Sequence, residues 1–292
     1  MASTSESIIA WRQVANSPLL LSIKTEWISL LSDHSKREQD YQSFLRDHAG
    51  FFFPNTGLVS REQLVLEKIA LGSDYVTDFV NLNNNRSYGF EYTLIEIESP
   101  HNHLYTKNKK NQTGAFNTAL QQIRNWKRWL TSNMDTAKRL FPSKQFSVTG
   151  VPSINFMLII GRREQHEAVM EERNQISRDE GIEVRSFDYL TDVLLSNHYA
   201  SYTAISRDLL PITRAQNNAF SNPFHVALSD STWRGLVSTF NPSYSHMIGH
   251  NLSNILAVRQ NNSARLNEFL TWIQQDGRNT IHPGEERVLE MT

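Results

Sequence analysis

Three carboxylates with the potential to act together lie in the stretch from Gly72 to Pro100, which reads GSDYVTDFVNLNNNRSYGFEYTLIEIESP. Two runs of β-branched and aromatic residues, Tyr75 to Leu82 and Glu91 to Ser99, flank a segment rich in Asn, Ser and Gly. Such a segment cannot pack in a sheet, so the pattern predicts a β-hairpin with a loose tip.

The predicted hairpin places Asp78 late in its first strand and Glu96 and Glu98 in its second. Both glutamates alternate with isoleucines and therefore project to the opposite side of the strand. Three carboxylates on one patch repel one another, which favours a divalent cation between them. Hard oxygen ligands suit Mg²⁺ or Mn²⁺ rather than zinc. The alternative is a solvated strand face that is acidic.

The same residues resemble a known active site. Asp78 and the run Glu96 to Glu98 look like the core of the PD-(D/E)xK nuclease superfamily, an Asp on one strand and (Asp/Glu)-x-Lys on the next. The ordered segments LIEIESP, HNHLYTKNKK, ALQQIRNWKRWL, LIIGRR and IEVRSFDYL are similar, more narrowly, to the nuclease domain of the Shedu antiphage defence proteins. This resemblance covers roughly residues 35 to 195.

The resemblance implies a metal-dependent DNA endonuclease that nicks or cleaves phage duplex DNA. Asp78 and Glu96 would hold the metal, with the Ile97 carbonyl contributing, and Glu98 would act on the attacking water. Two positions depart from the pattern, because Thr77 replaces the usual proline and Glu98 replaces the lysine. The alternatives are a DNA-binding or sensing module that has lost cleavage, and a resolvase or repair nuclease of the superfamily.

Two helical residues also match the family pattern. Glu38 lies on a helix expected over Ser35 to Asp47 and would reach the metal site, although a solvent-facing glutamate is an equal alternative. Gln122 lies four residues before Trp126 on a helix expected over Ala115 to Leu130, and its amide would position the scissile strand or a water.

Basic residues near these elements are candidates for phosphate contacts, with a solubilising surface as the alternative. They lie in the loop after the hairpin, on the helix that carries Gln122, and after an apolar strand: Lys107, Lys109, Lys110, Arg124, Lys127, Arg162 and Arg163.

The composition bounds the remaining possibilities. The chain has 292 residues, a net charge of -1 and no cysteine, so attraction to DNA would need local basic patches, and disulfides and thiolate metal sites are excluded. No signal pattern and no apolar run of membrane-spanning length occurs, which favours the cytoplasm of a prokaryote and no membrane partner.

These elements predict an α/β fold with a restriction-endonuclease-like mixed sheet flanked by helices. We expect a helical segment at 1–34, the nuclease-like domain at 35–199 and an all-helical extension at 200–292. The amphipathic stripes outside the central domain predict a homo-oligomer, a dimer or tetramer. Further elements are expected over Leu64 to Leu71 and Ile154 to Ile160 as strands, Glu164 to Glu180 as a helix, Ile182 to Phe187 as a strand, and Met247 to Leu256 and Leu266 to Ile273 as helices.

Overall fold

The computed structural model describes residues 17–53, 63–84, 90–108, 111–142, 150–196 and 263–275. Its centre is a five-stranded sheet in the order β1-β4-β5-β6-β7. The strands are β1 (Gln63–Glu67), β4 (Phe79–Asn84), β5 (Phe90–Ile97), β6 (Ser153–Ile159) and β7 (Ile182–Arg185). The first three are antiparallel and the last three parallel, so the predicted mixed sheet is confirmed.

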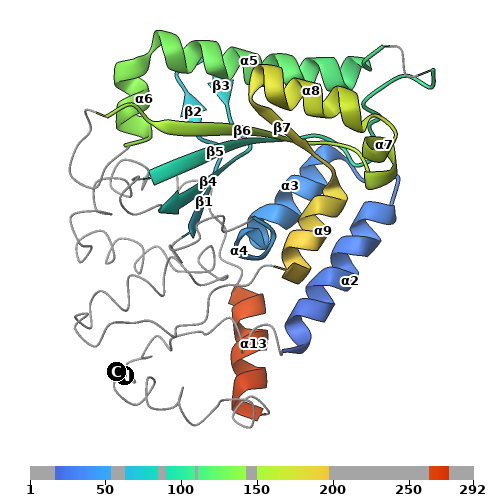
Figure 1. The fold of residues 1–292 in the computed structure, drawn as a ribbon. Helices are drawn as coiled ribbons and strands as arrows, with labels where there is room; N and C mark the ends of the chain where they lie inside the picture. The colour runs from blue at the N-terminus through green and yellow to red at the C-terminus, as the bar shows by residue number, and fades with distance from the viewer. Residues whose placement is uncertain are drawn as a thin grey trace.

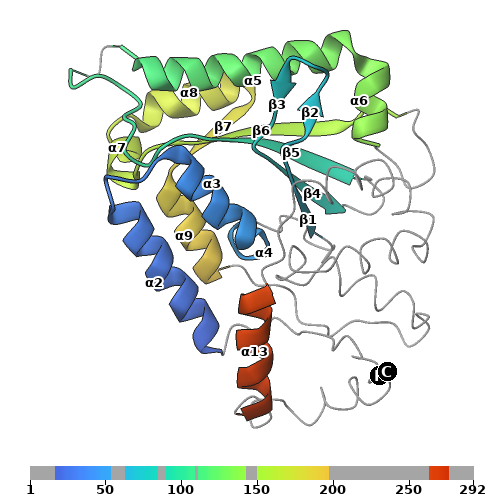
Figure 2. The same cartoon turned by 180° about the vertical axis from the view of Figure 1, so that it is seen from behind.

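Helices cover both faces of this sheet (Figures 1 and 2). One face packs against α5 (Gly114–Ser132), α6 (Met134–Leu140) and α8 (Met170–Glu180). The other packs against α2 (Pro18–Ser32), α3 (Glu38–Asp47), α4 (Ala49–Phe52) and α9 (Phe187–Ser196). The short helix α7 (Arg163–Glu167) follows β6, and a small separate ribbon pairs β2 (Ala70–Leu71) with β3 (Tyr75–Val76).

The alternation predicted for β5 is confirmed by its burial. Ile95 and Ile97 lie in the core beside α2 to α4 and α9, whereas Leu94 lies in the core beside α5. Glu96 shares the parity of Leu94 and therefore projects to the α5 side, at the carboxyl end of the strand. The apolar strand β6 also contributes side chains to both cores, because it is covered on both faces.

Three expected elements differ from the structure. The predicted strand Tyr75 to Leu82 is two strands, and Asp78 lies just before β4 rather than late in a strand. The predicted strand Leu64 to Leu71 stops at Glu67, since Lys68 adopts a left-handed backbone with φ 54°. The predicted helix Glu164 to Glu180 is the pair α7 and α8, which Ala168 and Val169 separate.

The predicted C-terminal helix over Leu266 to Ile273 is confirmed as α13 (Ser263–Gln275). It lies against the end of α2 (Figure 1), where Arg265 contacts Glu26 and Phe269 is fully buried. The predicted helix at Met247 to Leu256 lies outside the described residues. Within the described residues, no helix is long and apolar enough to span a membrane.

Candidate functional site

The structure brings four carboxylates together at one end of the sheet. Asp78 precedes β4, Glu96 lies in β5, Glu98 follows it, and Glu38 begins α3. Burial raises the pKa of Glu38, Glu96 and Glu98, and the negative charges of their neighbours in the group raise these pKa values further. The antiparallel register of β4 and β5 explains why Asp78 and Glu96 are neighbours. Phe79 lies opposite Ile95, so the preceding Asp78 lies beside the following Glu96.

Asp78 is held by protein donors on both of its carboxylate oxygens. Its Oδ1 accepts from Lys68 Nζ at 2.6 Å and from Gln42 Nε2 at 3.0 Å. Its Oδ2 accepts from the Ile97 backbone N–H at 2.8 Å. The side chain is only 9% exposed, so these bonds replace water and fix the carboxylate at the edge of the group.

Glu96 is the least satisfied acid of the group. It is buried, and its Oε2 has no hydrogen-bond partner among the described residues. Burial, followed by the charges of Asp78 and Glu98, raises the pKa of Glu96 to about 10. A buried, unpartnered carboxyl oxygen is costly to the fold, which is typical of a group kept for a ligand.

Glu98 is half-buried and is oriented by Asn102, whose Nδ2 donates to Glu98 Oε2 at 3.1 Å. Burial and the charge of Glu38 raise the pKa of Glu98 to about 7. A carboxylate with this pKa is a better proton acceptor than an ordinary glutamate, and a large fraction remains ionised at neutral pH. The position therefore suits a general base.

The donor set of this group fits a hard divalent cation, because all of its side-chain ligands are carboxylate oxygens. Within the described ranges, however, no three acidic or histidine side chains are already placed to hold a metal ion. Asp78 is turned toward the Lys68 ammonium instead. Metal binding by Asp78 and Glu96 would thus require Lys68 to give way.

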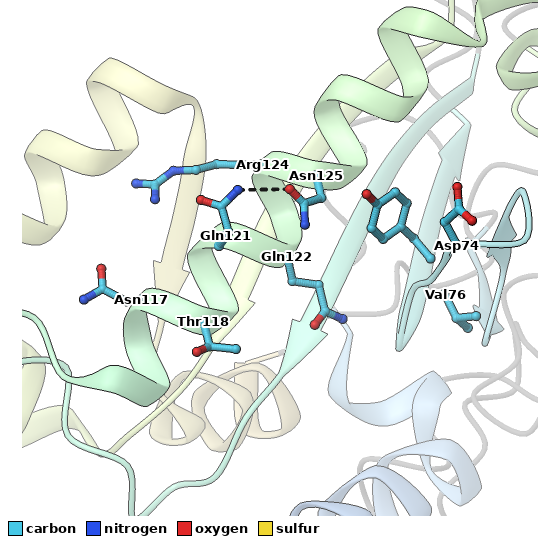
Figure 3. Close-up of a pocket in the computed structure, with 9 residues that line it drawn as sticks. Asp74, Val76, Asn117, Thr118, Gln121, Gln122, Arg124 and Asn125 are labelled. Carbon is cyan, nitrogen blue, oxygen red and sulfur yellow. Dashed lines mark hydrogen bonds between the residues drawn. The ribbon is translucent and has the colours of Figure 1, made fainter.

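Gln122 lines a separate open groove of about 700 Å³ between α5 and the β2–β3 ribbon (Figure 3). Polar side chains of α5, including the charged Arg124, form one wall, and residues 74–76 form the other. In Figure 3, Gln121 donates to Asn125 along the helix, at 2.9 Å. The lining of this groove contains none of the four carboxylates of the acidic group, so the role of Gln122 in positioning a strand stays a prediction.

The basic residues differ in how free their charges are. Arg124 forms a bidentate pair with Glu180, and Lys127 donates to the Glu180 carbonyl. Arg162 pairs with Asp188, and Arg163 with Asp192. Lys107 is exposed on its loop, whereas Lys109 and Lys110 lie outside the described residues. DNA contacts by these residues stay predictions. A phosphate that binds one of the arginines would compete with the carboxylate that already pairs with it.

Three residues of the site were not anticipated from the sequence. Gln42 donates to Glu38 at 2.8 Å as well as to Asp78, and its spacing of one helical turn from Glu38 was a usable signal. Asn102 lies at the same spacing from Glu98. Lys68 offered no signal, because its contact with Asp78 depends on a left-handed backbone that a lysine rarely adopts.

Gly161 supports the site from the end of β6, and its replacement by alanine should destabilise the fold. Its φ is +69°, and a Cβ would lie 2.9 Å from the Asn102 carbonyl oxygen and 2.7 Å from Gln165 Oε1. We expect Gly161→Ala to lower the free energy of unfolding by ~1–3 kcal/mol, measured by urea denaturation.

Gly114→Ala is the matched control for this prediction. A Cβ there meets nothing within 4 Å, and the residue begins α5. Its free energy of unfolding should stay within ~0.5 kcal/mol of the wild-type value or rise. Equal losses in both variants would contradict the assigned role of Gly161.

Comparison with known proteins identifies the family. The family model described as Shedu protein SduA, C-terminal, matches residues 35–191, which is more than half of the chain. No curated protein and no solved structure matches the chain, so the restriction-endonuclease-like fold stays a prediction. The matched segment contains the whole acidic group, from Glu38 to Glu98. The chain therefore belongs to the Shedu family, and this membership implies a role in antiphage defence.

Proposed function

We propose that this protein is an Mg²⁺- or Mn²⁺-dependent endonuclease that cuts duplex DNA in antiphage defence. The observation that carries the proposal is the group of four carboxylates around Glu96, whose buried Oε2 has no hydrogen-bond partner in the described part of the chain. Carboxylates gathered in this way suit a cation that neutralises them and a phosphate that approaches with it. Family membership supports the defence context.

Asp78 and Glu96 would hold the cation, which would supply positive charge to polarise a phosphoryl oxygen and to lower the pKa of the attacking water. Glu98, oriented by Asn102, accepts a proton from the attacking water. The water oxygen forms a bond to phosphorus and the P–O ester bond breaks, which leaves a phosphate on one strand end and a hydroxyl on the other. The leaving oxygen takes its proton from solvent.

A DNA-binding or sensing module is the second candidate, and two observations favour it. Both oxygens of Asp78 are already bonded to protein donors, and the strand position after Ile97 carries a glutamate instead of a lysine. In this arrangement the charge of Asp78 is balanced by protein donors, and no metal ion is needed there. Such a protein would bind DNA in the presence of Mg²⁺ and leave it intact.

One assay separates the two candidates. The full-length protein is incubated with supercoiled plasmid and with linear duplex in Mg²⁺, Mn²⁺, Ca²⁺ or EDTA, and binding is followed in parallel by mobility shift. We expect nicked or linear products with Mg²⁺ or Mn²⁺ and none with Ca²⁺ or EDTA. Binding without any cleavage on every substrate would make the protein a binding module. The homo-oligomer stays a prediction that the protein's mass in solution would test.

A further inference from the structure

Lys68 enters the acidic group through an unusual backbone turn. It follows the last residue of β1 and is the only non-glycine residue with positive φ among those the structure describes. Its backbone N–H donates to the Asp78 carbonyl at 3.0 Å, so strand pairing continues while the chain changes direction. Strain of this kind persists where surrounding contacts impose it, and it is enriched at functional sites.

The turn aims the lysine ammonium at the carboxylates. Nζ donates to Asp78 Oδ1 at 2.6 Å and to Gln42 Oε1 at 2.9 Å. An ammonium has three donors, and the third has no protein partner among the described residues. The side chain is 36% exposed, so a molecule arriving from solvent can reach it.

The charge of Lys68 is also placed where a phosphodiester would need it. Its positive charge opposes the rise in the pKa of Glu38, Glu67 and Glu96, which places the ammonium within electrostatic range of all three. Four carboxylates repel a DNA phosphate, and one divalent ion neutralises only part of their charge. Glu98 adds to this repulsion at a position where a cation would relieve it.

We propose that Lys68 is a catalytic residue of this site. Its ammonium reaches the scissile phosphate from the end of β1 rather than from the position that Glu98 occupies. This inference rests on the proposed nuclease function. Lys68 would donate to a non-bridging phosphate oxygen through the ammonium hydrogen that has no partner among the described residues, while Asp78 and Glu96 would hold the divalent cation. Its ammonium stabilises the charge that grows on this oxygen as water attacks.

The absence of other cysteines allows a direct test. Lys68→Cys should lower the single-turnover cleavage rate at saturating Mg²⁺ on the order of 10²–10³-fold. Alkylation of this single thiol with 2-bromoethylamine rebuilds an ammonium at nearly the length of lysine and should restore at least about a tenth of the lost rate. Alkylation with iodoacetamide adds a neutral group and should restore nothing.

Two readouts separate catalysis from a structural role. If Lys68 only neutralised Asp78, its removal would tighten Mg²⁺ binding and leave the rate at saturating Mg²⁺ unchanged, and that result would overturn the proposal. The melting temperature of each variant verifies the fold. Lys68→Asn is the second variant, because asparagine tolerates the left-handed backbone better than most residues, and it should show the same loss of rate.

Lys138→Cys, treated with the same reagents, is the matched control. Lys138 lies on α6, at the far end of α5 from the acidic group (Figure 1). The Lys138→Cys protein should therefore cleave DNA at the wild-type rate, whether untreated or alkylated with either reagent. A Lys68→Cys protein as fast as wild type, or one that 2-bromoethylamine fails to revive, would overturn the role of Lys68 alone. A wild-type protein that cuts no DNA would instead overturn the proposed function.

Discussion

Glu96→Gln should abolish DNA cleavage and at the same time make the metal-free protein more stable. The rate at saturating Mg²⁺ should fall on the order of 10³-fold, which corresponds to about 4 kcal/mol of activation free energy, because glutamine removes a charged metal ligand. Stability should rise because a buried carboxyl beside Asp78 and Glu98 is replaced by a neutral amide of the same shape.

The measurement pairs single-turnover cleavage with urea denaturation at about pH 8 in EDTA, where we expect a gain of at least ~1 kcal/mol. Asp78→Asn should lose activity equally but lose stability as well. Each Asp78 oxygen accepts bonds from donors, Lys68 and Gln42 on one and the Ile97 N–H on the other, and an amide nitrogen would face one of these sets.

Glu91→Gln serves as the control on the same strand. Glu91 lies at the opposite end of β5 from Glu96, so the substitution should leave the cleavage rate within ~3-fold of the wild-type rate. If Glu96→Gln cleaved DNA as fast as this control, Glu96 could not be a metal ligand in the reaction.

Much of the acidic group follows from local rules that sequence reasoning can apply. Strand alternation separates Glu96 and Glu98 from Ile95 and Ile97, and hairpin pairing brings the Asp78 segment to the same end of the sheet. These rules depend on period and adjacency, not on exact element boundaries. The sequence therefore predicts the wrong strand boundary at Asp78, which lies before β4, and still predicts its neighbours Glu96 and Glu98.

Features that depend on contacts between distant segments could not be predicted in this way. The ion pairs of Arg124 with Glu180 and of Arg162 with Asp188 join positions far apart in the sequence, and no periodic pattern in the sequence predicts them. Lys68 is the clearest example, since an apolar run predicts that the strand continues and only tertiary contacts impose the left-handed turn. Sequence reasoning thus favoured free arginines and overlooked the lysine beside Asp78.

The second large effect concerns pH. Without metal, the free energy of unfolding should fall steadily as pH rises through about 7.5 to 9, with a slope approaching 1.4 kcal/mol per pH unit. In the folded protein the pKa of Glu96 is about 10, so its carboxyl keeps its proton across this window, whereas in the unfolded chain it loses the proton near the ordinary glutamate pKa of 4.5. Rising pH therefore favours the unfolded state across this window.

Other titratable groups change the free energy of unfolding mainly below about pH 7.5. Burial first, and neighbouring carboxylates second, raise the pKa of Glu98 to about 7, and burial raises the pKa of Glu67 to about 7, so both steepen the loss of stability between pH 4.5 and 7. Burial lowers the pKa of His48 and His166, which gives the opposite slope, but only below the ordinary histidine pKa of 6.5. Above about pH 7.5, Glu96 should dominate.

Urea denaturation in EDTA at several pH values within this window measures the slope, and Glu96→Gln should remove most of it. Saturating Mg²⁺ should cancel the trend and leave the free energy of unfolding nearly independent of pH. An ion held by the ionised carboxylate displaces the proton, so the stabilisation by Mg²⁺ should grow with pH and offset the metal-free loss. Glu91→Gln should keep the wild-type slope in both conditions. A wild-type stability that is flat between about pH 7.5 and 9 would show that Glu96 ionises normally, and an effect of Mg²⁺ that is independent of pH would place the ion elsewhere.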